Sequence, residues 1–91
     1  MITIKRSDIV DILDMVNIPE DAIREAYSGR GMYGKTCFGL DVDNHQAAYR
    51  FFAAAGQMLD EDVAVDLAES ANWDSMGLGI IVYFPRITLK N

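Results

Sequence analysis

The sequence predicts a small α+β domain, in which two or three helices pack on an antiparallel sheet of three or more strands in the order α-β-β-α-α-β. Apolar residues recur at helical spacing in some segments and alternate at strand spacing in others. Of the 91 residues, 51% are apolar and 24% are charged, a globular composition that can fill one core. We therefore expect residues 1–91 to form a single domain.

The first helix is predicted over residues 8–16. Its apolar face consists of side chains spaced three and four apart, namely Ile9, Ile12, Leu13 and Val16. Ser7 or Asp8 is expected to cap its start, and Asn17 suits the position just past its end. Pro19 then prevents simple continuation of the helix.

Residues 19–28 fit two structures, because Pro19 and two acids resemble a first helical turn whereas residues 23–28 alternate like a strand. The glycines that follow interrupt regular structure, and residues 35–42 alternate with one apolar face. We therefore predict a hairpin whose strands, at about 23–28 and 35–42, are joined by a glycine-rich loop.

A wide apolar stripe predicts a helix over residues 45–59, capped by Asp43 or Asn44. Another helical stretch opens at Asp60. Residues 72–75 have the composition of a turn.

Residues 78–84 are β-branched and aromatic and predict a central strand, covered on both faces and ended by Pro85. Residues 2–4 and 87–89 are expected to add short edge strands. An exposed tail strand would leave an edge that a second copy could pair with, so a homodimer remains an open alternative.

Composition excludes several classes of function. With 8 basic and 14 acidic side chains, the net charge of −6 argues against a direct nucleic-acid binder. The single Cys and single His exclude an intrachain disulfide and the common zinc sites, and no cofactor is expected. No apolar run reaches the roughly 20 residues of a membrane span. The free thiol and the absence of a signal core predict a cytoplasmic protein, in the cytosol of a host cell.

Negative charge is concentrated between Phe51 and Pro85, where there is no Lys or Arg. The acids of this segment are Asp60, Glu61, Asp62, Asp66, Glu69 and Asp74. They could be the solvated face of a helix, or a patch that docks on a basic surface of a partner protein.

The glycine-rich loop is the most specific feature of the sequence. Its candidate ligand-binding residues are Ser28, Gly29, Arg30, Gly31, Tyr33 and Lys35. Amides in a glycine-bearing turn can hold an anion, and Arg30 and Lys35 would add positive charge. This predicts a positive φ at Gly31. The alternative is that the glycines only build a wide hairpin loop.

Residues 29–36 also match the P-loop pattern G-x-x-x-x-G-K-[ST]. We reject a P-loop because the pattern requires a helix after it, whereas residues 35–42 alternate like a strand. His45 is interpreted as a solvated residue of a first helical turn, and Cys37 as a structural thiol. Since no nucleophile–base pair or metal set is visible, we do not expect an enzyme.

Trp73, Met76 and Phe84 could form an exposed recognition cluster, but a domain this small needs its large apolar residues inside. We therefore interpret all three as core.

Residues 27–37 (YSGRGMYGKTC) and 74–85 (DSMGLGIIVYFP) resemble segments shared by a group of small uncharacterised bacteriophage proteins. The resemblance covers about a quarter of the chain and implies an origin rather than a mechanism. It implies Arg30, Tyr33 and Lys35 in the first segment, and Asp74 and Met76 in the second, as positions to test. In the predicted topology the two segments could lie at the same end of the sheet and form one site.

Such proteins often act by binding. We therefore expect an anti-defence (anti-CRISPR-like) protein that inhibits a host defence or regulatory protein, with the acidic segment as the contact. The alternative is a sponge that binds a phosphorylated small molecule, such as a nucleotide signal, at the glycine-rich loop.

Overall fold

The computed structural model describes residues 2–91, apart from the side chain of Met76. Its elements follow in chain order: β1 (Ile2–Lys5), α1 (Arg6–Met15), the 3-10 helix η1 (Glu20–Ala22), β2 (Ile23–Tyr27), β3 (Cys37–Val42), α2 (His45–Met58), α3 (Glu61–Ser70), β4 (Asn72–Met76), β5 (Gly79–Tyr83) and β6 (Ile87–Lys90). A 4-stranded antiparallel sheet has the order β2-β3-β5-β4, and β1 pairs with β6 in parallel. The α+β class is confirmed, but the order α-β-β-α-α-β is wrong because it omits β1, β4 and β6.

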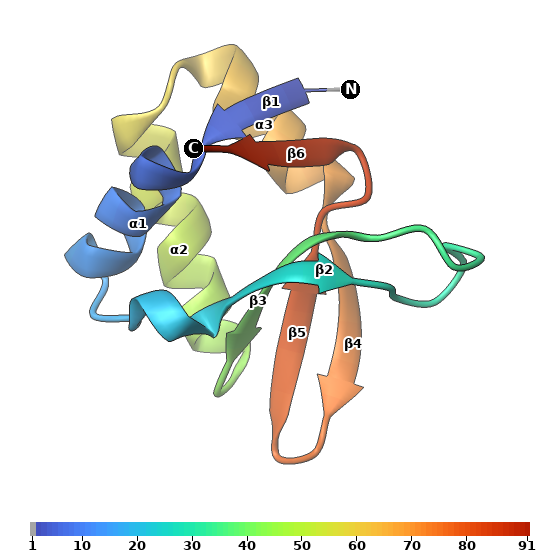
Figure 1. The fold of residues 1–91 in the computed structure, drawn as a ribbon. Helices are drawn as coiled ribbons and strands as arrows, with labels where there is room; N and C mark the ends of the chain where they lie inside the picture. Colours follow the sequence, from blue (N-terminus) through green and yellow to red (C-terminus); the bar gives the residue numbers. More distant parts are fainter. Residues whose placement is uncertain (1) are drawn as a thin grey trace.

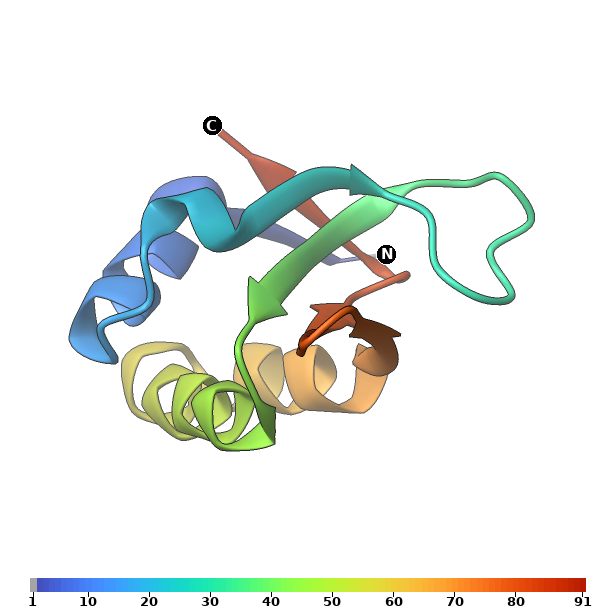
Figure 2. The same ribbon diagram turned by 90° about the horizontal axis from the view of Figure 1, so that it is seen from below.

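The helices cover one face of the sheet (Figure 1), with α2 and α3 side by side beneath it in Figure 2. On that inner face, Phe38 of β3 stacks on Phe84 with ring centroids 4.6 Å apart, and Phe51 of α2 packs against Phe84. Because side chains alternate along a strand, Cys37 and Tyr83 point to the outer face. There they form a second, smaller cluster with Met32.

Helix α1 begins earlier than predicted, directly after β1. Lys5 is its N-cap residue and makes no side-chain cap bond, so the prediction of a Ser7 or Asp8 cap is wrong. Its end matches the prediction. Asn17 has a φ of 61°, and the amide of Ile18 donates to the carbonyl of Leu13 at 2.9 Å. This is the left-handed cap that asparagine tolerates.

The ambiguous residues 19–28 contain both predicted structures, a single 3-10 turn in η1 and then strand β2. Residues 72–75, predicted as a turn, instead belong to β4. Their polar side chains suit an edge strand, and the turn lies at Gly77 and Leu78, where Gly77 supplies a φ of 60°. The tail segments are strands as expected, but β1 and β6 pair with each other rather than with the edge of the larger sheet.

The glycine-rich loop (residues 28–36) joins β2 to β3 and projects beyond the sheet in both views (Figures 1 and 2). Strand β5 lies between β3 and β4, and its side chains from Ile80 to Tyr83 are buried, as predicted for a central strand. The chain then turns at Pro85 into β6, which brings β6 near the base of the loop. This placement forms the hollows described next.

Candidate functional site

The glycine-rich loop is anchored to the outer face of the sheet. The Tyr83 hydroxyl donates to the carbonyl of Arg30 at 3.1 Å. Met32 is buried, and its sulfur accepts from the Gly29 amide at 3.3 Å and from the Cys37 thiol at 3.6 Å. A Cβ on Gly29 would overlap the Tyr83 ring, so this glycine is required by close approach. The loop therefore has a defined conformation although it projects from the domain.

Three residues of the loop have backbone conformations in the left-handed region. Gly31 has a φ of 83°, which confirms the prediction for that residue, and Gly34 has a φ of 84°. Tyr33 lies between them with a φ of 53° and is 97% exposed. A bulky side chain in this region is strained, and such strain often marks a functional segment. The ring of Tyr33 is thus exposed on the loop and accessible to a ligand or partner.

A hollow of about 370 Å³ lies on one side of this loop, and we call it the loop hollow. It is lined by Arg30, Gly31, Met32, Tyr33, Lys35, Thr36, Asn72 and Pro85. No carboxylate lines it, and within residues 2–91 neither Arg30 nor Lys35 makes an ion pair. In a chain with a net charge of −6, this is a local concentration of positive charge.

The predicted ligand-binding residues are only partly brought together here. Arg30, Gly31, Tyr33 and Lys35 line the loop hollow, whereas Ser28 and Gly29 do not. Fewer loop amides than predicted are free to bind an anion. The Met32 amide donates to the Gly29 carbonyl, and the Lys35 amide donates to the Met32 carbonyl. Recognition of an anion would therefore depend mainly on the two cationic side chains.

The P-loop pattern has no P-loop geometry. Strand β3 follows Thr36, so no helix N-terminus faces the loop. The rejection of that motif agrees with the structure.

A hydrogen bond across the outer face joins residues 27–37 to residues 74–85. The hydroxyl of Tyr27 in β2 donates to the Asp74 carboxylate in β4 at 2.8 Å, and the Tyr27 ring lies 5.2 Å from that of Tyr83. Burial, followed by the bond to Asp74, raises the pKa of Tyr27 to about 12. The segments therefore do meet at one place. The side chain of Met76, named for the second segment, lies outside what the structure describes.

The predicted acidic segment is divided between two places. Asp60, Glu61 and Asp62 lie at the N-terminus of α3, where carboxylates stabilise their own helix through its dipole. Asp66 and Glu69 follow on α3, and we call these five residues the acidic face. Asp74 is not part of it, because it lies on β4 and accepts from Tyr27.

An aromatic cluster on the surface was not predicted. Trp73 of β4 stacks against His45 of α2 with ring centroids 5.3 Å apart, and Tyr49 meets Trp73 edge-on at 6.0 Å. Trp73 is 38% exposed, so its assignment to the core is wrong, whereas Phe84 is fully buried as expected. The helical spacing of His45, Tyr49 and Phe52 could have signalled one aromatic face, but the position of Trp73 depends on β4.

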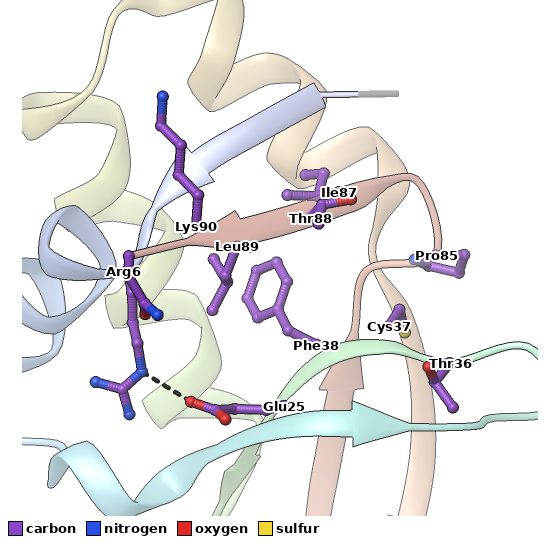
Figure 3. A pocket seen from close by; sticks show the side chains of 11 residues that line it. Arg6, Glu25, Thr36, Cys37, Phe38, Pro85, Ile87, Thr88, Leu89 and Lys90 are labelled. Carbon is purple, nitrogen blue, oxygen red and sulfur yellow. Dashed lines mark hydrogen bonds and ion pairs between the residues drawn. The ribbon is translucent and has the colours of Figure 1, made fainter.

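A second hollow, the β3–β6 cleft, has a volume of about 430 Å³ (Figure 3). Phe38 and Leu89 extend toward each other between β3 and β6, and the buried Ile87 also lines the cleft. Arg6 and Glu25 close one end, where Arg6 Nε donates to Glu25 Oε1 at 2.9 Å. The carboxylates of Glu20 and then Glu25 raise the pKa of Arg6.

Cys37 also lines the β3–β6 cleft, but its thiol is buried and bonded to Met32, and burial raises its pKa. A thiol with a raised pKa is a poor nucleophile at neutral pH, which fits the structural role expected for Cys37.

Within residues 2–91, no three His, Cys, Asp or Glu side chains gather where they could hold a metal ion. None of the described helices is long and apolar enough to cross a membrane. A scan against protein-family models, a search of curated proteins and a search of solved structures each found no match.

Proposed function

We propose that this chain is a binding protein rather than an enzyme, and that the glycine-rich loop captures a phosphorylated small molecule. The loop hollow carries the proposal, because Arg30 and Lys35 line it without any carboxylate. Arg30 offers a planar fork of donors to a phosphate and Lys35 a point charge. The β3–β6 cleft differs, because its Arg6 is paired with the carboxylates of Glu20 and Glu25.

Anchoring of the loop supports the same function. A ligand that binds a mobile loop must order it, and this ordering lowers the affinity. Here Met32 and Tyr83 already hold the loop against the sheet, so the backbone that carries the two cations is ordered before the ligand arrives. In the setting that the phage resemblance implies, the protein would act in the cytosol of a host cell by sequestering a phosphorylated signal.

The test is calorimetric titration of the wild type and of Arg30→Ala with inorganic phosphate. We expect the substitution to weaken binding at least tenfold and to leave the circular dichroism spectrum unchanged. Arg86→Ala is the matched control, because Arg86 is exposed and does not line the loop hollow. Equal affinities of the wild type and Arg30→Ala would refute the proposal.

The second candidate function is inhibition of a host defence or regulatory protein that has a basic surface. The acidic face supports it, since Glu61, Asp62 and Glu69 are exposed and no Lys or Arg occurs between Phe51 and Pro85. Long-range attraction would speed docking and weaken with salt.

This candidate is tested by capture from host lysate. The triple variant Asp62→Lys, Asp66→Lys, Glu69→Lys should lose a stoichiometric protein partner that the wild type retains at low salt. Capture at full strength by the variant would exclude the acidic face as the contact.

A further inference from the structure

The β3–β6 cleft and the loop hollow are neighbours. Thr36 and Pro85 line both of them, so the two hollows meet where the loop enters β3 and where β5 turns toward β6. In Figure 3 these two residues stand at one end of the cleft, and Arg6 and Glu25 stand at the other. A ligand held by Arg30 and Lys35 in the loop hollow therefore has the cleft as the adjoining space for the rest of its structure.

The chemistry of the cleft differs from that of the loop hollow. Its floor is apolar, formed by the partly exposed Leu89 over the buried Phe38 and Ile87. Its far end is polar, because the Glu25 carboxylate and the Arg6 guanidinium meet there. A carboxylate can accept hydrogen bonds from the edge of a ring, and a guanidinium can donate to its acceptors.

A flat heterocycle suits this combination. Its faces can cover the apolar floor while its edge reaches the polar end, as in ligand sites that are mostly apolar with a few placed polar groups. An alkyl chain would cover Leu89, but it would remove water from the Arg6–Glu25 ion pair and offer no hydrogen bond in return, and this lowers affinity.

We infer that the β3–β6 cleft is the base-binding half of a nucleotide site, whose phosphate-binding half is the loop hollow. The ligand class is a nucleoside phosphate, with its phosphate at Arg30 and Lys35 and its base over Leu89. This inference rests on the proposed function of the loop and adds to it the part of the molecule that selects the ligand.

The first experiment is titration of the wild type with inorganic phosphate, with the four ribonucleoside monophosphates and with hexyl phosphate. At least one nucleotide should bind tenfold more tightly than inorganic phosphate and more tightly than hexyl phosphate. Tighter binding of hexyl phosphate than of every nucleotide would overturn the inference, and so would equal binding of nucleotides and phosphate.

The second experiment fills the cleft. Leu89→Trp should abolish the advantage of the nucleotide and leave the affinity for inorganic phosphate unchanged. Leu78→Trp is the matched control, because Leu78 is fully exposed at the turn between β4 and β5. Wild-type nucleotide affinity in Leu89→Trp would overturn the inference.

Leu89 packs against the core, so its substitution could disturb folding. Methyl chemical shifts of the wild type provide a test without substitution. The nucleotide should shift the methyl groups of Leu89 and Ile87, whereas inorganic phosphate should shift only signals of the loop. Unshifted Leu89 and Ile87 methyls at saturating nucleotide would refute the cleft as the base site.

The two proposals fail in different ways. If phosphate binds and Arg30→Ala abolishes the binding, but no nucleotide binds more tightly, only the inference about the cleft is wrong. If neither phosphate nor any nucleotide binds, the proposed function of the loop is wrong as well.

Discussion

The glycine-rich loop and helix α3 hold charge of opposite sign in different ways. On α3, Asp60, Glu61 and Asp62 lie where the helix dipole favours carboxylates, so local structure alone explains their presence. In the loop, Arg30 and Lys35 gain nothing comparable, and Tyr33 is held in a strained conformation. Charge and strain without a local structural reason are the stronger indication of a binding role.

The largest effect should come from disturbing how the loop is anchored. Gly29→Ala places a methyl group in the Tyr83 ring, which must move, and we expect a loss of about 1–3 kcal/mol in the free energy of unfolding. Phosphate binding should be lost with it. Urea unfolding followed by fluorescence measures the stability.

Gly56→Ala is the matched control for Gly29→Ala. A Cβ on Gly56 meets nothing within 4 Å, and the residue lies inside α2. This variant should gain roughly 0.5–1 kcal/mol, because alanine is the better helix former. Equal effects of the two substitutions would mean that the Gly29 contact does not anchor the loop.

A smaller effect is expected from the bond between Tyr27 and Asp74. Tyr27→Phe removes the donor and leaves a half-buried carboxylate, so unfolding should become easier by about 1–2 kcal/mol. A thermal melt of the variant measures the loss. Capture of a partner protein by the acidic face should be unchanged in this variant, since Asp74 is not part of that face.

The raised pKa of Tyr27, caused first by burial and then by the bond to Asp74, predicts that stability depends on pH. The pKa of Tyr27 is raised to about 12, above the value of about 10 for an exposed tyrosine, so the folded state holds this proton more tightly than the unfolded state. The resulting stabilisation is complete below pH of about 10 and is lost as pH rises toward 12. Unfolding free energies measured across this range should fall more steeply for the wild type than for Tyr27→Phe.

The smallest effect should follow changes on the acidic face. Asp66→Lys and Glu69→Lys together should change stability by no more than about 0.5 kcal/mol, because Glu69 is exposed, Asp66 is partly exposed, and both lie beyond the first turn of α3. Denaturant midpoints test this expectation. A large loss of stability would mean that these carboxylates have a structural role, which Arg30 and Lys35 in the loop do not have.

The strongest local patterns predicted the fold correctly where neighbours along the chain decide it. The apolar spacing in α1 and α2, the Asn44 cap of α2 and the positive φ of Gly31 all belong to this class. The pairing of β1 with β6 joins residues from opposite ends of the chain. Strand β4 is polar and has no alternating pattern, so only its pairing with β5 makes it a strand.

The candidate site divides in the same way. The sequence by itself determined that a glycine-rich loop with Arg30, Tyr33 and Lys35 would follow a strand, because glycine and charge are local properties. Only the tertiary structure decided that Pro85 lies against this loop and that the β3–β6 cleft adjoins the loop hollow. It also decided that Asp74 lies apart from the acidic face and accepts a hydrogen bond from Tyr27. These contacts join distant segments through burial and strand pairing, and local sequence patterns do not encode such pairings.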